Sequence, residues 1–474
     1  MSTSEPAVVA VDVGTSAVRS GLFGLSGRLL RSARVPRTAG VGDLFDAAEL
    51  LAGVGASLRE LAADSRPRAL CVSAHIGSVA VDARLDPVLP GGGWSDTRGL
   101  DLLRRIPDAQ RAALLASAGR PALSGGAAAL ALALGGLGLR ERVHAVLSPK
   151  DLLVAQLTGR VSSDTVDAAY TLVSDVRTRS WQDDALRFLG LPGSWFAPQV
   201  EPTAVVGEIH GDGARCTGLP EGTPVVSGGP DGSVGIGLLL GDNPSGIADV
   251  AGTTDVLARL IDDPARARSG AVVNPAMAPE MWTAGGATGM TGGAVARWRA
   301  LAGAVDDDRL AAVPAGSHGL LIFPSLSGER FPRWRPEARG AVLGLGSDHG
   351  PAEILRAAQE GAGFTVREGA DLLDPDRGLP LLFAGGSARS THVAQLRADT
   401  LGRAVHVASD PDVTLLGAAA LALVGIGEVR DLDEARDRLG LTFRTVEPRE
   451  RHTSRYDEVF ARWSAARESG GAAG

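Results

Sequence analysis

Two short segments rich in glycine and hydroxyl side chains, about half a chain apart, have the composition of phosphate-binding turns. The first contains Asp12, Gly14, Thr15 and Ser16, and the second contains Gly252, Thr253 and Thr254. Each lies between two apolar, strand-like runs, so each is expected at the tip of a hairpin. Glycine lets a ligand approach the backbone, and successive N–H groups in a turn form a concavity that binds anions. The pair predicts a phosphate held from two sides, although either segment alone would be an ordinary Gly-Thr turn.

Two charged residues next to the first segment suit phosphate chemistry. Asp12 ends a buried strand, and a carboxylate there would repel a phosphate unless a hydrated Mg²⁺ lay between them. Arg19 follows Thr15 by four residues and could reach a terminal phosphate. The simpler alternatives are that Asp12 caps the turn and that Arg19 is a surface residue.

Asp231 is the carboxylate best suited to act as a general base. It follows the β-prone residues 223–227, and the glycines on both sides of it leave room for a ligand. A helix beginning just after Asp231 would present its N-terminus at the same place. An aspartate is a sufficient base for a sugar hydroxyl when the transferring phosphoryl group supplies most of the driving force. Taken alone, the motif would be an ordinary helix N-cap.

Further segments offer groups that suit a polyol or a nucleotide. Trp94, Asp96 and Arg98 combine an aromatic face with two charges, although such a cluster is more often a surface turn. His75 and Ser78 follow a buried strand and could line the same cleft, or His75 could be structural. Nucleotide binding at a helix N-terminus is suggested by the strand–helix junction at Gly385, Gly386 and Ser387. Neither a Walker sequence nor a Rossmann glycine fingerprint after the first strand is present.

The elements that must position these residues alternate between strand and helix in both halves. This alternation predicts two α/β domains, residues 1–242 and 243–474, separated at the linker-like residues 240–245. The charged residues beyond 430 predict a helical tail. The expected strands of the first half are 7–11, 18–23, 28–35, 68–73, 79–81 and 223–227, with helices at 43–63, 100–118 and 151–157. The expected strands of the second half are 246–250, 256–260, 319–323, 379–384 and 404–407, with helices at 352–373, 391–401 and 414–424.

Composition excludes several classes of protein. The chain has 474 residues, 44% of them apolar, and a net charge of −8 without any block of basic residues, which argues against nucleic-acid binding. The two cysteines, Cys71 and Cys216, indicate a reducing compartment, and no signal peptide is evident, so we expect a cytoplasmic protein. Residues 121–139 carry no charge, but their proline, glycines and serines favour a buried helix over a membrane span. Lys150 is the only lysine, either by chance or because a compact ammonium is needed there.

Together these segments resemble the FGGY family of carbohydrate kinases, which includes xylulokinase, gluconokinase, ribulokinase and glycerol kinase. The resemblance runs in order over nearly the whole chain. It rests on residues 12–19, 94–98, 147–152 with 157–159, 228–231, 252–254, 326–330 and 385–389. Each motif is modest alone, and seven in register are a strong match.

The resemblance implies two actin/RNase-H-like (ASKHA) domains with the active site in the cleft between them. It implies transfer of the ATP γ-phosphate to a sugar hydroxyl, with Asp231 as base and Mg²⁺ near Asp12 and Asp231. Lys150 is then mainly structural, and a homodimer is one expected assembly because dimers are common among relatives. The ATP-binding residues would be Asp12, Gly14, Thr15, Ser16, Arg19, Gly252, Thr253, Thr254, Gly385, Gly386 and Ser387. The sugar-binding residues would be His75, Ile76, Gly77, Ser78, Trp94, Asp96, Arg98 and Asp231.

One departure from the family leaves the substrate open. Xylulokinases usually have Gly-Gln-Met-His-Gly where this chain has residues 74–78, and the family histidine falls at Gly77. The expected substrate is therefore a ketopentose, a ketohexose or a sugar acid. Two alternatives are a conformational-switch ATPase of the actin and chaperone type, and a sugar-binding regulator that has lost catalysis. Retention of Asp12, Thr15, Asp231 and Thr253 counts against the regulator.

Overall fold

The first half of the chain is organised around a sheet whose central strands are completely buried. The computed structural model describes residues 5–37, 43–62 and 65–470. Every residue of β1 and of β5 is buried, because these parallel neighbours are covered on both faces. The strand order is β13-β14-β5-β1-β2-β3. The strands are β1 (Ala7–Val13), β2 (Ala17–Gly24), β3 (Leu29–Pro36), β5 (Ala69–Ala74), β13 (Val205–Glu208) and β14 (Pro224–Pro230).

The second half contains a sheet with the order β17-β18-β16-β15-β21-β22-β23. Its strand β15 pairs antiparallel with β16 and parallel with β21, as β1 does with β2 and β5. The outermost strand beyond the parallel strands is antiparallel in both sheets, β13 in one and β23 in the other. The strands are β15 (Ile247–Ala251), β16 (Asp255–Ile261), β17 (Val272–Pro275), β18 (Trp282–Ala287), β21 (Leu381–Ala384), β22 (Val405–Ala408) and β23 (Phe443–Val446). The repeated α/β architecture expected from the sequence is therefore present.

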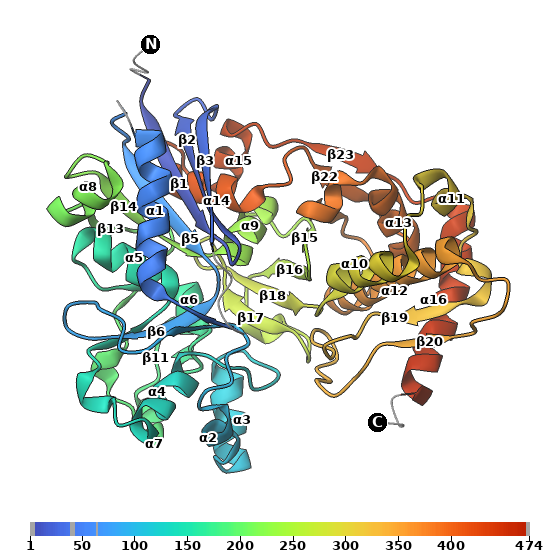
Figure 1. Cartoon of the computed structure of the whole chain (residues 1–474), viewed down its shortest axis with the longest axis horizontal. Coiled ribbons are helices and arrows are strands. Elements are labelled where there is room, and N and C mark those ends of the chain that lie inside the picture. The colour runs from blue at the N-terminus through green and yellow to red at the C-terminus, as the bar shows by residue number, and fades with distance from the viewer. Residues whose placement is uncertain (1–4, 38–42, 63–64, 471–474) are drawn as a thin grey trace.

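Helices cover both sheets, and one helix crosses from the second half to the first. Helix α14 (Val413–Gly425) packs against α9 (Asp231–Leu240), β1 and β5, and Figure 1 shows it beside the first sheet. Its residues Leu416 and Ala420 share a core with Val8 and Ala10 of β1. The other long helices are α1 (Ala47–Ala62), α5 (Pro149–Thr158), α12 (Pro351–Leu373), α13 (Thr391–Leu401) and α16 (Glu450–Gly470).

The remaining elements are short. A small sheet of order β4-β7-β6-β8 lies at the carboxyl end of the first half's strands. Its strands are β4 (Leu44–Phe45), β6 (Gly77–Val81), β7 (Gly91–Gly93) and β8 (Ala145–Leu147). The other strands are β9 (Ser163–Asp164), β10 (Ser174–Asp175), β11 (Ser180–Trp181), β12 (Gln199–Val200), β19 (Leu321–Phe323) and β20 (Ala341–Leu343). The other helices are α2 (Leu100–Arg104), α3 (Asp108–Ser117), α4 (Ala127–Gly136), α6 (Thr165–Ala169), α7 (Asp183–Leu189), α8 (Gly211–Thr217), α10 (Thr291–Ala302), α11 (Asp307–Ala312) and α15 (Leu432–Arg438).

Two expected helices differ in the structure, and the buried helix expected within residues 121–139 is present. The helix expected at 43–63 begins only at Ala47, because residues 44–45 form strand β4, and its expected end at residue 63 lies outside the described residues. The helix expected at 100–118 is two helices, α2 and α3, and Pro107 precedes the second because proline lacks the N–H that a helix interior requires. The uncharged stretch 121–139 contains the ten-residue α4. Within the described residues, none of the helices has the length and apolar character needed to cross a membrane.

The residues beyond 430 are not a purely helical tail. Strand β23 closes the edge of the second sheet by pairing with β22. Helix α16 buries Tyr456 and Trp463 completely, so its apolar face belongs to the core of the second half. Residues 471–474 lie outside the described residues. The charged residues of this segment lie mainly on its solvent-exposed face. A prediction based on charge therefore missed strand β23.

Candidate active site

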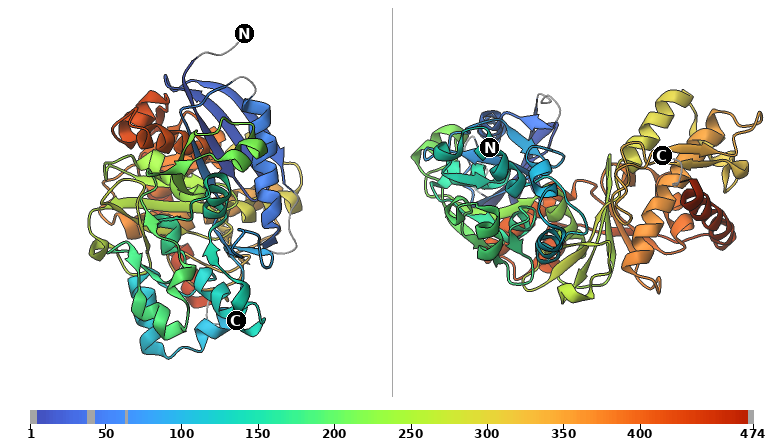
Figure 2. Two further views of the ribbon diagram at one scale, coloured as in Figure 1. Left: turned by 90° about the vertical axis from the view of Figure 1, so that its left-hand side faces the viewer. Right: turned by 90° about the horizontal axis from the view of Figure 1, so that it is seen from below.

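A cavity of about 300 Å³ lies between the two halves. The first half contributes Ile76, Trp94 and Asp231 to its lining, and the second half contributes Thr254 and Arg330. In the right-hand view of Figure 2 the two halves form separate lobes. Because both lobes line the cavity, a ligand bound there would contact both.

Asp12 lies at the carboxyl end of β1, where it is held by its neighbours on both adjacent strands. It is opposite Arg19 on β2 and Ser73 on β5. Arg19 Nε donates to Asp12 Oδ2 at 3.1 Å, and the Ser73 hydroxyl donates to Asp12 Oδ1 at 3.2 Å. Arg19 Nη1 also lies 2.7 Å from Asp412 Oδ2, just before α14. Arg19 therefore joins the first sheet to a residue of the second half.

Asp231 is the first residue of α9 and directly follows β14. The strand reaches it through Gly228, whose φ of +72° and close approach to β5 require glycine: a Cβ there would lie 1.9 Å from the Val72 carbonyl oxygen. The N–H of Gly232 donates to Asp231 Oδ1 at 2.6 Å. The tight junction thus presents the carboxylate to the cavity at the N-terminus of a helix.

The two carboxylates influence each other. Burial raises the pKa of Asp12 to about 7, with Arg19 acting in the opposite direction and the charge of Asp231 adding to the rise. Burial also raises the pKa of Asp231, while the Gly232 N–H, His75 and Arg19 lower it. Asp12 is buried and Asp231 is half-buried, and the charge of Arg19 lowers the pKa of both carboxyl groups. Two carboxylates that influence each other in this way attract a cation.

The segment that begins at His75 forms one wall of the cavity. The His75 backbone N–H donates to the Val13 carbonyl at 2.9 Å, which fixes the segment to β1. Its buried ring packs edge-on against Phe45 at 4.9 Å between centroids. Burial lowers the pKa of His75. Ile76, Gly77 and Ser78 line the cavity, so the histidine braces a segment whose next residues face the ligand space.

The expected polyol cluster is divided by the structure. Trp94 lines the cavity, and the guanidinium of Arg330 lies 4.5 Å from its ring centroid. Asp96 and Arg98 instead pair with each other, with Arg98 Nη2 2.7 Å from Asp96 Oδ2. Arg98 also donates to the Pro90 carbonyl at 3.0 Å. This pair braces the turn after β7 beneath Trp94.

Both glycine-hydroxyl segments form tight turns between antiparallel strands. In the first, the Gly14 N–H donates to the Ala17 carbonyl at 3.0 Å, and Thr15 and Ser16 are exposed at the tip. In the second, the Gly252 N–H donates to the Thr254 carbonyl at 3.0 Å, and the Thr253 carbonyl accepts from Gly293 N–H at 2.9 Å. Thr254 lines the main cavity.

A second cavity, of about 120 Å³, lies within the second half. Gly252 and Ser387 line it, together with Gln359 and Arg397. Gly385 has a φ of +90°, and a Cβ there would lie 2.5 Å from the Ala251 carbonyl oxygen, so its backbone abuts the end of β15. Gly386 begins the short turn that follows. The segment 385–387 thereby adjoins the second turn.

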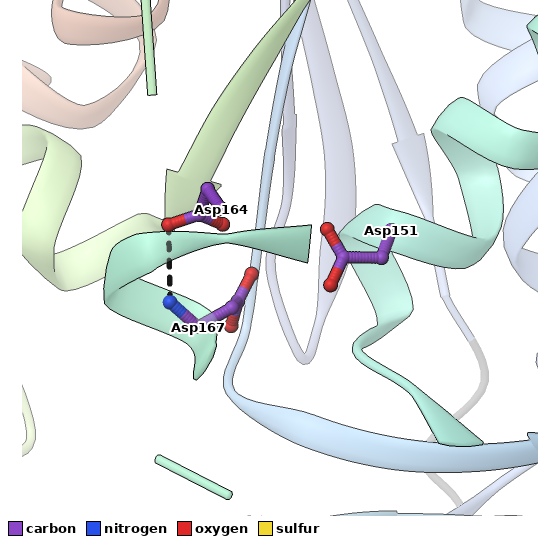
Figure 3. Close-up of side chains that lie close together, drawn as sticks. All are labelled: Asp151, Asp164 and Asp167. Atoms are coloured by element: carbon purple, nitrogen blue, oxygen red, sulfur yellow. Dashed lines mark hydrogen bonds between the residues drawn. The ribbon is translucent and has the colours of Figure 1, made fainter. Parts of the chain in front are cut away.

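Lys150 lies in a fully buried cluster of carboxylates. Its Nζ is 2.5 Å from Asp151 Oδ1, 2.8 Å from Asp164 Oδ2 and 3.9 Å from Asp167 Oδ2. Figure 3 shows the three aspartates converging, and their spacing would also suit a metal ion. The ammonium already supplies the positive charge at their centre, and Asp164 also caps α6 through the N–H groups of Val166 and Asp167. A compact ammonium is what this site requires, which explains a lysine among so many arginines.

Three cavity residues, Arg120, Tyr170 and Asn274, carried no signal in the sequence. The Arg120 guanidinium lies 4.6 Å from the Tyr170 ring centroid, and Asn274 Nδ2 donates to the Tyr170 hydroxyl at 3.2 Å. They come from a loop before α4, from the end of α6 and from β17. Contacts at such separations leave no local sequence pattern.

The repeated sheets with a carboxylate-bearing cavity between them define a two-domain α/β kinase fold. The solved structure of a ligand-bound xylulose kinase from Lactobacillus acidophilus matches with a TM-score of 0.90 at 22% identity, covering 99% of each chain. A gluconate kinase from Lactobacillus acidophilus matches with the same TM-score, identity and coverage.

The family follows from the sequence models. Residues 7–237 match the N-terminal domain, and residues 248–426 the C-terminal domain, of the FGGY family of carbohydrate kinases. The chain belongs to this family. The xylulose kinase of Escherichia coli (strain K12) is 30% identical over 313 residues, which cover 64% of each protein. The gluconokinase of Bacillus subtilis (strain 168) is 27% identical over 317 residues, covering 62% of this chain and 61% of that protein. The chain thus spans slightly less than two thirds of the length of these two relatives.

Proposed function

We propose that the protein transfers the γ-phosphate of ATP to a hydroxyl group of a sugar or sugar acid. The observation that carries this proposal is the position of Asp231, at a helix N-terminus in the cavity between the halves, electrostatically linked to Asp12 and Arg19. Membership of a carbohydrate kinase family supports the same reaction.

Asp231 is proposed to accept the proton of the attacking hydroxyl. A general base works best when its pKa is nearer the working pH than that of a free aspartate, and burial raises the pKa of Asp231 in that direction. Small residues flank it on both sides, so the hydroxyl reaches the carboxylate without obstruction. As the hydroxyl oxygen forms its bond to the γ-phosphorus, the bond between that phosphorus and the ADP oxygen breaks, ADP leaves, and Asp231 takes the hydroxyl proton.

Asp12 and Asp231 are proposed to hold Mg²⁺. The fit rests on the buried carboxylate of Asp12, the half-buried carboxylate of Asp231 and the Ser73 hydroxyl beside Asp12, because oxygen atoms are the ligands that Mg²⁺ prefers. When bound, the ion would neutralise phosphate charge that the carboxylates otherwise repel. Arg19 is proposed to exchange its contact with Asp412 for a terminal phosphate oxygen.

The remaining ATP contacts are proposed to come from the two turns. Gly14, Thr15 and Ser16 would face the phosphates from the first half, and Gly252, Thr253 and Thr254 from the second. The adenosine would occupy the cavity that Gly252 and Ser387 line, beside Gly385 and Gly386.

The sugar is proposed to lie between Trp94 and the segment 76–78. His75, Asp96 and Arg98 then act as positioning residues, since each holds a cavity-lining neighbour in place. We propose residues 1–242 and 243–474 as the two domains. We also propose a homodimer, which light scattering would test.

ADP release in the presence of pentuloses, hexuloses, aldonates and polyols tests the proposed reaction. We expect at least one of these compounds to stimulate release, and Asp231→Asn to abolish the stimulation. Asp249→Asn is the matched control. It makes the same replacement, of a carboxyl group by an amide, at a buried aspartate of the second sheet. ATP turnover that no sugar stimulates would contradict the proposal.

A further inference from the structure

Two guanidinium groups in the main cavity, those of Arg120 and Arg330, have no acidic partner within the part of the chain that the structure describes. Arg120 donates to three neutral oxygens, the Val273 carbonyl at 2.9 Å, Asn274 Oδ1 at 2.7 Å and the Gly119 carbonyl at 3.4 Å. Arg330 lies against the Trp94 ring. Among the described residues, no carboxylate pairs with either side chain, whereas the buried Arg356, Arg397, Arg403 and Arg467 each pair with an aspartate or a glutamate.

The uncompensated charge is most costly at Arg120. Its side chain is only 7% exposed, and burial lowers its pKa to about 10. Burial also lowers the pKa of Arg330. A buried charge without a counter-charge destabilises the folded protein unless a ligand supplies one. The binding of an anion beside these two guanidinium groups would therefore stabilise the folded protein.

Both arginines line the main cavity together with Tyr170. The Arg120 guanidinium lies 4.6 Å from the centroid of the Tyr170 ring. We call Arg120, Tyr170 and Arg330 the basic wall. The basic wall and Asp231 line the same cavity, so one ligand can meet both.

We propose that the basic wall binds a carboxylate carried by the sugar substrate, and hence that the substrate class is an aldonate-type sugar acid. The inference rests on the proposed kinase function and specifies its substrate. Guanidinium groups present paired N–H donors that match the two oxygens of a carboxylate. The hydroxyl to be phosphorylated would lie at the Asp231 end of the same molecule.

The experiment compares an aldonate with the alditol of the same carbon skeleton, in which a neutral hydroxymethyl group replaces the carboxylate. We expect the wild type to prefer the aldonate. Arg120→Gln and Arg330→Gln should each raise KM for the aldonate about 10- to 100-fold, since hydrogen bonds to charged groups are of that strength, and leave kcat/KM for the alditol nearly unchanged. Equal losses of kcat/KM with both substrates would overturn the proposal. They would show that Arg120 serves only to hold the two halves together, through Val273 and Asn274.

Arg179→Gln is the matched control for such a joining role. Arg179 also bridges the halves, through the Met281 carbonyl at 2.8 Å and the Trp282 ring at 5.0 Å, but it does not line the cavity. We expect this variant to treat the two substrates alike. An aldonate-selective loss in Arg179→Gln would overturn the assignment to the basic wall.

Calorimetric titration of the aldonate into Asp231→Asn separates this proposal from the kinase proposal. We expect binding without turnover, weakened by Arg120→Gln. Tighter binding of a sugar phosphate than of the aldonate would overturn the choice of a carboxylate. Asp231-dependent phosphorylation of neutral sugars alone would overturn the sugar-acid inference and leave the kinase function standing, whereas failure of every sugar would overturn the kinase function.

Discussion

The turn between β1 and β2 and the turn between β15 and β16 occupy equivalent places, because in each sheet the strand before the turn also pairs parallel with a third strand. Each has buried aspartate paired with arginine behind it. In the first, Asp12 pairs with Arg19, whose side chain is 36% exposed and reaches the other half. In the second, Arg397 is 6% exposed and lies 2.6 Å from Asp255 Oδ1 and 3.5 Å from Asp249 Oδ2.

The difference between the two turns is access. Burial and the neighbouring Asp255 raise the pKa of Asp249 well above its ordinary range, and this carboxyl is enclosed behind the second turn beside Arg397. Asp12 instead interacts with Asp231, which lines the cavity between the halves. Both sheets therefore support a glycine-hydroxyl turn with an aspartate–arginine pair behind it, and only the first pair reaches the other half, through Arg19 and Asp412.

Asp231→Asn should have the largest effect. Removing a general base typically lowers kcat by about 10²- to 10⁴-fold, and the amide retains the size of the carboxyl group. Steady-state ADP release measures the loss, and circular dichroism should show an unchanged fold. A kcat within a factor of two of the wild type would remove Asp231 from the proposed mechanism.

Lys150→Met tests whether the buried cluster of Lys150 and three aspartates in the first half stabilises the fold. The change leaves three buried carboxylates without their counter-charge, so we expect the free energy of unfolding to fall by about 3–5 kcal/mol. Urea denaturation measures it. Arg104→Met, which breaks a highly exposed pair with Asp101, should change stability by less than about 1 kcal/mol. Similar values for both variants would contradict a structural role for the buried cluster.

Asp12→Asn should weaken the response to Mg²⁺. Loss of groups that merely orient metal ligands costs about 10- to 100-fold in affinity, and loss of a ligand should cost at least as much. The Mg²⁺ concentration for half-maximal ADP release measures this effect. An unchanged Mg²⁺ dependence would show that Asp12 is not a ligand of the metal.

Asp249→Asn should have the smallest effect, because burial and Asp255 raise the pKa of this carboxyl and so favour its uncharged form, which the amide resembles. The folded state holds a proton that the unfolded chain releases above about pH 3.8, so wild-type stability falls as pH rises above that value. The variant lacks this fall and should be as stable as the wild type, or more stable, at neutral pH. Thermal unfolding at pH 5 and pH 8 compares them. A strongly destabilised variant with wild-type pH dependence would show that Asp249 is charged.

The features that could be predicted from the sequence are those that depend on local patterns. Two glycine-hydroxyl turns, the junction at Asp231 and the alternation of strands and helices were all readable, because each depends on neighbours within a few residues. The position of Arg120 was not, since it depends on Val273 and Asn274 in the other half. Asp96 and Arg98 show a second limit: their types were visible, but only the structure shows that they pair with each other.

The crossing of α14 to the first sheet has a consequence for how the chain is made. The first half leaves the ribosome with one face of β1 and β5 uncovered, because α14 and the contact of Arg438 with the Leu25 carbonyl come late in the chain. At ordinary rates of synthesis this interval lasts roughly 10–40 s. The nascent first half therefore needs protection from aggregation throughout translation of the second. Release of the last residues completes the core of the first.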